Sequence, residues 1–192
     1  RLDRYIWEQA AAKLGEWKKA GINMSISVNI SPKDFYYIDI FNTFAGLIKK
    51  YDIEPSNLKI EITETTIMSD VPNLMGELEE LRKAGFTLEM DDFGSGYSSL
   101  NTLKDINVDV LKVDMGFIKE TKNVKKSRII LASVIKMAKE LNLLIITEGV
   151  ETEEQVDNLT KLGCDVFQGY YFSKAIDVNE FEKRYLYRKK AG

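Results

Sequence analysis

Residues 58–90 read LKIEITETTIMSDVPNLMGELEELRKAGFTLEM and contain one complete strand–helix–strand unit. Apolar and polar residues alternate in Leu58–Ile62 and again in Phe86–Met90, which is the two-residue period of a β-strand. Between them, residues 71–84 carry leucines at helical spacing, and the pattern stops at Gly85. A helix that joins two such strands is typical of a parallel sheet.

The same alternation continues on both sides of this unit. Further strands are predicted at Met24–Ile30, Asp109–Val113, Leu143–Thr147 and Asp165–Gln168, and further helices at residues 2–19, 39–51, 125–141, 152–162 and 178–188. This order favours a single α/β domain over residues 1–192, a TIM-like (β/α) barrel that is incomplete, with about six of its eight βα units. An open, doubly wound sheet is the alternative.

Composition excludes several classes of protein. The 192 residues carry a net charge of −3, which indicates neither a nucleic-acid polymer nor a membrane surface as partner, and no apolar run is long enough to span a bilayer. The single cysteine, Cys164, cannot form an intrachain disulfide, so a cytoplasmic setting is expected. Histidine is absent, which excludes His-based triads and histidine-ligated zinc and leaves oxygen ligands for any metal.

Polar residues end six consecutive predicted strands. They are Asn29, Glu61, Asp91, Lys112, Glu148 and Gln168. For any one of them taken alone, a solvated surface group or a helix cap is the favoured explanation. Together they favour a site at the carboxyl ends of the strands, where barrel enzymes have their active sites. Several acids buried together require cations to neutralise them.

The segment Asp91-Asp-Phe-Gly-Ser-Gly-Tyr-Ser-Ser-Leu100 is the most specific motif in the chain. Adjacent strand residues point to opposite faces, so both aspartates can serve one site only where the strand is ending. Asp91 could then bridge two metals while Asp92 binds one. The alternative is a tight turn in which Asp92 caps a helix.

These segments resemble the EAL domain family, phosphodiesterases that linearise cyclic di-GMP. The resemblance runs from Trp7 to about Ser173 in the family's order and with similar spacing. The matching motifs are Ser27-Val-Asn29-Ile-Ser31, Glu61-Ile-Thr-Glu64, the double-aspartate segment, Leu111-Lys112-Val-Asp114, Thr147-Glu148-Gly-Val-Glu151, Gly163-Cys-Asp165 and Gln168-Gly-Tyr170.

The resemblance implies a role for each matching residue. It implies that Asn29, Glu61 and Asp91 bind one metal ion, and that Asp91 and Asp92 bind a second. Lys112 would steady the attacking water and the phosphate, Glu148 would be the general base or help to hold the second metal, and Gln168 would lie near the substrate. The implied supports of the site are Glu64, Glu151 and the loop residues Gly94, Ser95, Gly96 and Tyr97.

The resemblance also implies the reaction and the partners. We expect metal-dependent hydrolysis of cyclic di-GMP to linear pGpG with Mg²⁺ or Mn²⁺, inhibition by Ca²⁺, a homodimer, and a possible cyclase or sensor domain upstream. The family's Glu-Ala-Leu motif and first two strands have no match here, so this chain by itself is expected to be weak or inactive. A non-catalytic module that binds cyclic di-GMP, or a dimerising regulatory module, is the alternative.

Lys59 precedes Glu61 by two residues, and Glu89 precedes Asp91 by two residues. Because side chains alternate along a strand, Lys59 and Glu89 should point to the same inner face as these acids, on neighbouring strands. We predict a buried ion pair between them beneath the metals. The alternative is that local twist turns one of the two side chains to solvent.

Overall fold

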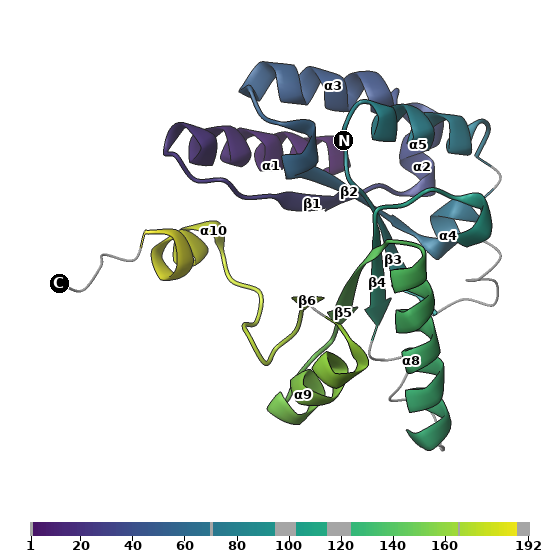
Figure 1. The fold of residues 1–192 in the computed structure, drawn as a ribbon. Coiled ribbons are helices and arrows are strands. Elements are labelled where there is room, and N and C mark those ends of the chain that lie inside the picture. The colour runs from purple at the N-terminus through teal and green to yellow at the C-terminus, as the bar shows by residue number, and fades with distance from the viewer. Residues whose placement is uncertain (1, 70, 95–102, 115–123, 165, 188–192) are drawn as a thin grey trace.

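Six parallel strands form one sheet in the sequential order β1-β2-β3-β4-β5-β6. The computed structural model describes residues 2–69, 71–94, 103–114, 124–164 and 166–187. Its strands are β1 (Ile26–Asn29), β2 (Leu58–Thr63), β3 (Leu88–Phe93), β4 (Val110–Asp114), β5 (Leu144–Glu148) and β6 (Val166–Phe167). The sheet curls, and the helices that connect its strands lie on its outer side (Figure 1). This is the predicted incomplete α/β barrel.

The helices predicted from the sequence periodicity are present, together with two short helices that were not predicted, one directly after β1 and one directly after β2. They are α1 (Leu2–Lys19), α2 (Pro32–Tyr37), α3 (Ile40–Tyr51), α4 (Glu64–Ile67), α5 (Leu74–Lys83), α8 (Val124–Glu140), α9 (Glu153–Leu162) and α10 (Val178–Phe181), with a 3₁₀ turn at Pro55–Asn57 and a π-helical turn at Glu182–Leu186. Among the described residues, none of these helices combines the length and apolarity that crossing a membrane requires.

Local capping explains where several helices begin. The Asp39 side chain accepts a hydrogen bond from the Asn42 amide at the start of α3, and Thr152 accepts one from the Gln155 amide at the start of α9. Helix α2 was not predicted; Pro32 occupies its first turn, and the Ser31 amide donates to the Asp34 carboxylate at 2.8 Å.

The core lies between the outer face of the sheet and the helices. The apolar phase of the strands is buried there, as Val28, Ile60 and Leu88 illustrate. From α1 and α3, the rings of Trp7 and Phe44 pack with centroids 5.1 Å apart. Each such side chain contributes about 1.5–3 kcal/mol by leaving water. Because the apolar side chains of β1, β2 and β3 point to this outer face, the polar side chains that alternate with them point to the inner face of the curled sheet.

The C-terminal segment returns to the first helix. The indole nitrogen of Trp17 donates to Glu182 Oε1 at 2.8 Å, and the rings of Trp17 and Phe181 lie 5.9 Å apart. Accordingly α10 lies away from β6 in Figure 1. The segment after the last strand therefore packs on an element that lies beside the first strand.

Candidate active site at the strand ends

Lys112 joins three carboxylates at the carboxyl end of the sheet. Its Nζ lies 2.8 Å from Glu61 Oε1, 2.9 Å from Glu148 Oε1 and 3.3 Å from Asp91 Oδ1. The lysine comes from β4, and the acids come from β2, β5 and β3. Only 4% of Lys112 is exposed, so solvent screens these contacts weakly.

Asn29 joins the same cluster from β1. It is the register partner of Glu61, and its Nδ2 donates to Glu61 Oε2 at 3.2 Å. The main-chain oxygen of Asn29 accepts a hydrogen bond from the indole of Trp7 at 3.0 Å. Helix α1 therefore anchors the end of β1, a supporting role for Trp7 that its helical spacing alone did not reveal.

A bulge in β3 brings both aspartates to one side. The register with β4 shifts between Met90 and Phe93, and Asp92 has a left-handed backbone with φ 56°. Both aspartates were predicted to share a site because the strand ends there; β3 ends at Phe93, one residue after Asp92, and the bulge lies in this last stretch. The Asp92 amide donates to Asp91 Oδ1 at 3.0 Å, which fixes the Asp91 carboxylate within the strand.

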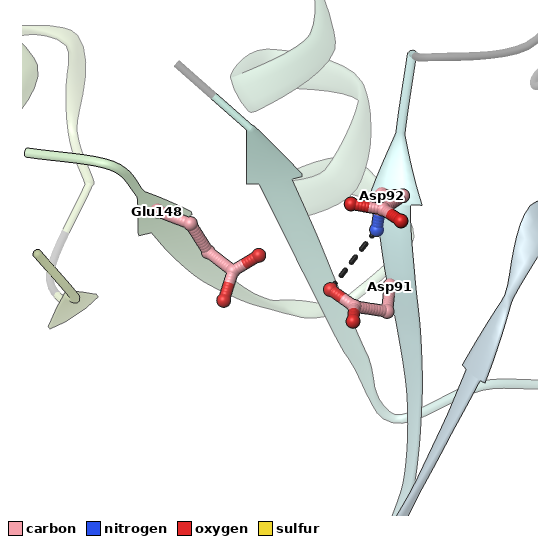
Figure 2. A group of neighbouring side chains, drawn as sticks. All are labelled: Asp91, Asp92 and Glu148. Carbon is pink, nitrogen blue, oxygen red and sulfur yellow. Dashed lines mark hydrogen bonds between the residues drawn. The ribbon is translucent and has the colours of Figure 1, made fainter. Parts of the chain in front are cut away.

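Three carboxylates form a group that suits a divalent cation. Oxygen atoms of Asp91, Asp92 and Glu148 all lie within 4.8 Å of one another. Figure 2 shows Glu148 at the end of β5 directing its carboxylate toward Asp91 on β3. An all-oxygen donor set of this kind fits Mg²⁺, Mn²⁺ or Ca²⁺. Beside this group, Glu61 accepts hydrogen bonds from both Asn29 and Lys112.

The charges in the cluster shift one another's pKa values. Burial raises the pKa of Glu148 to about 7 despite its bond to Lys112, and the charge of Asp91 adds to the rise. Burial likewise raises the pKa of Glu61 and of Asp92. Burial alone would lower the pKa of Lys112, but its bonds to Glu61 and Glu148 outweigh burial and raise it. The cluster therefore holds a charged lysine beside two glutamates, Glu61 and Glu148, that bind a proton more readily than an ordinary carboxyl group.

The predicted ion pair beneath the cluster is confirmed. Lys59 Nζ lies 3.0 Å from Glu89 Oε1, and Glu89 is 1% exposed. The Ser27 hydroxyl donates to the second oxygen of Glu89 at 2.8 Å. Ser27 was not expected to contribute, although it lies on the same inward phase of β1 as Asn29.

The remaining predicted residues differ in burial, and some lie outside the residues that the structure describes. Gln168 follows β6 and is exposed. Its main-chain N–H donates to the main-chain oxygen of Thr147 at 2.8 Å. Glu64 is buried at the start of α4, while Glu151 is exposed between β5 and α9. Gly94 ends the described part of its loop with φ 98°, and Ser95, Gly96 and Tyr97 lie outside the described residues.

Gly169 is a further support that the sequence reasoning missed. A Cβ at this position would lie 2.1 Å from the Val150 oxygen, so only glycine permits this approach. Val150 follows Glu148 by two residues, and its amide donates to Gln168 O at 3.1 Å. The close approach therefore ties the chain after Glu148 to the chain after β6.

Fold and site together define an α/β barrel-type protein with an acidic, lysine-bridged cluster at its strand ends. The chain belongs to the EAL domain family, whose model matches residues 1–175. The signaling protein YkoW of Bacillus subtilis is 34% identical over 182 residues, which are 95% of this chain and 23% of YkoW. The bifunctional diguanylate cyclase/cyclic di-GMP phosphodiesterase MucR of Pseudomonas aeruginosa is 33% identical over 94% of this chain and 26% of MucR.

Solved structures agree with this assignment. The chain is similar to a MucR phosphodiesterase in complex with c-di-GMP, with a TM-score of 0.85 and 32% identity over 94% of this chain and 73% of that one. It is also similar to a manganese and cyclic di-GMP complex of BlrP1 from Klebsiella pneumoniae, with a TM-score of 0.79 and 29% identity over 91% of this chain and 44% of that one. The chain thus spans about a quarter of the length of each of these two relatives, YkoW and MucR.

Proposed function

We propose that the protein containing this chain is a metal-dependent phosphodiesterase that opens cyclic di-GMP to linear pGpG. The cluster of Glu61, Asp91 and Glu148 around Lys112 carries the proposal. It lies at the strand ends, where barrel enzymes have their active sites, so a catalytic role explains these charges better than a purely structural role. The chain's family membership and the names of its relatives as cyclic di-GMP phosphodiesterases support cyclic di-GMP as the substrate.

The donor set fits divalent cations at two neighbouring positions. Asp91 and Asp92 would hold one ion with Glu148 beside it, and Asn29 and Glu61 together with Asp91 would hold another. When bound, Mg²⁺ or Mn²⁺ supplies Lewis-acid polarisation of a phosphoryl oxygen and of water. Ca²⁺ prefers longer and more numerous oxygen contacts, which is consistent with inhibition.

Glu148 is suited to accept the proton of the attacking water. Its carboxylate lies within 4.8 Å of oxygens of Asp91 and Asp92, so it would be within reach of a water bound to an ion held there. In the proposed step the water oxygen attacks phosphorus and gives its proton to Glu148, the bond from phosphorus to one ribose oxygen breaks, and that oxygen takes a proton from solvent while Glu148 releases its own to solvent. Lys112 stays charged throughout, holds the acids together and attracts the phosphate.

The other assignments remain predictions around this centre. Gln168 would border the substrate, and Glu64 with residues Gly94–Tyr97 would shape the loop after the double aspartate. Glu151 would support the Glu148 segment. A homodimer, an upstream cyclase or sensor domain, and a cytoplasmic setting complete the proposal.

Turnover of cyclic di-GMP by the full-length protein tests this function. With Mn²⁺ or Mg²⁺, chromatography should detect pGpG, and Glu148→Gln should lower the rate about 10²–10⁴-fold. Glu140→Gln, on the exposed face of α8, is the matched control and should leave the rate unchanged. Binding of cyclic di-GMP without turnover would favour the non-catalytic binding module, and neither binding nor turnover would favour a dimerising module.

A further inference from the structure

A second polar layer lies directly beneath the site. It consists of Ser27, Lys59 and Glu89, joined by the two contacts of the Glu89 carboxylate at 2.8 and 3.0 Å. Glu89 precedes Asp91 by two residues on β3 and is the register partner of Glu61. Two metal-site acids are therefore immediate neighbours of this carboxylate on the inner face of the sheet.

Stability does not explain a charged layer at this depth. Barrel interiors are mostly filled by branched apolar side chains. Replacing a buried ion pair by apolar residues of similar volume is often neutral or stabilising, because taking two charges out of water offsets their attraction. A role in the neighbouring metal site accounts for the buried charges of this layer.

The two charges of the layer are not equally screened. The Lys59 side chain is 22% exposed, whereas that of Glu89 is 1% exposed. Water weakens the field of the lysine more than that of the glutamate. The layer therefore acts on the strand ends above it mainly as a fixed negative charge.

We propose that Glu89 is a positioning residue of the metal site. Held by Ser27 and Lys59, its carboxylate adds negative potential beneath Glu61 and Asp91 and so increases the affinity of the site for a divalent cation. Lys59 limits this effect and keeps Glu89 in place. The inference rests on the metal site of the proposed function and deepens it, because it concerns residues that do not bind the ion themselves.

Binding of Mn²⁺ alone to the full-length protein tests the proposal by titration calorimetry. Glu89→Gln keeps the size and the hydrogen-bond acceptor but leaves Lys59 uncompensated, and should weaken Mn²⁺ binding about 10-fold to 100-fold. Adding Lys59→Met removes that excess positive charge and should recover a large part of the loss. Glu79→Gln and Lys83→Met, which change an exposed pair on α5, are matched controls and should stay within about twofold.

The double variant separates an electrostatic role from a packing role. If the layer only supports the fold, the double variant should bind Mn²⁺ as weakly as Glu89→Gln or more weakly, and that result would overturn the proposal. Binding by Glu89→Gln within twofold of the wild type would overturn it as well. A wild-type protein that binds no Mn²⁺ would instead refute the proposed function, and with it any role for the layer.

Discussion

Replacing Lys112 by methionine should destabilise the metal-free protein strongly. The variant keeps most of the aliphatic volume but removes the cation that lies 2.8, 2.9 and 3.3 Å from three carboxylates. Removing one partner of a buried ion pair costs about 3–5 kcal/mol, since the remaining charge stays buried without compensation. Against a total stability of about 5–15 kcal/mol, this is a large fraction of what holds the domain folded.

The loss should depend on pH and on metal. Glu61 and Glu148 already have raised pKa values, and the loss of the lysine raises them further. An acid whose pKa is higher in the folded state destabilises the fold as pH rises from its ordinary value to the folded one. The variant should therefore regain stability near pH 5, and Mn²⁺ should restore it at higher pH by replacing the missing positive charge.

Urea unfolding followed by circular dichroism measures this effect in EDTA and in Mn²⁺. Lys83→Met removes an exposed partner of Glu79 on α5 and should change stability by less than about 0.5 kcal/mol. If Lys112→Met stays within about 1 kcal/mol of the wild type at pH 8 without metal, the reasoning from its three carboxylate contacts is refuted.

Three further predictions concern the same site. The metal-free wild type should lose stability between about pH 5 and pH 7, because the pKa of Glu148 rises from 4.5 to about 7 on folding. In urea unfolding, the free energy of unfolding of Glu148→Gln should change less with pH than that of the wild type, and an equal change would contradict this cause. Asp92→Gly should keep or raise the melting temperature, because glycine readily adopts the φ of 56° found at this position. The same variant should weaken Mn²⁺ binding about tenfold or more in calorimetry, and unchanged binding would exclude Asp92 as a ligand. Gly169→Ala should cost about 1–3 kcal/mol in urea unfolding, because its Cβ would lie 2.1 Å from Val150 O. Gly46→Ala in α3, where the added carbon meets open space, should not destabilise, and equal losses in both variants would refute the argument from close approach.

The convergence of the strand-end residues could be predicted from the sequence. Side chains alternate along a strand, and the carboxyl ends of parallel strands meet at one edge. The structure brings Glu61, Asp91, Lys112 and Glu148 into contact as this reasoning implies. Their catalytic and metal-binding roles remain proposals.

The geometry of the double aspartate could not be predicted in the same way. Strand period places neighbouring residues on opposite faces, yet a bulge between Met90 and Phe93 turns Asp92 toward Glu148. Bulges arise from pairing with the adjacent strand, here β4, which lies further along the chain. Gln168 illustrates the opposite case, because its position at a strand end was predicted but its side chain is exposed.

The sequence by itself determined the order of strands and helices, the inward phase of the acids and the likeness to the EAL domain family, because these depend on local periodicity and on residue types at short spacing. Only the tertiary structure decided that Lys112 lies among three acids, that Asp92 turns inward and that Glu89 is buried against Lys59 and Ser27. Those contacts join residues from different strands. Their distances depend on how the whole sheet curls and pairs, which no local pattern encodes.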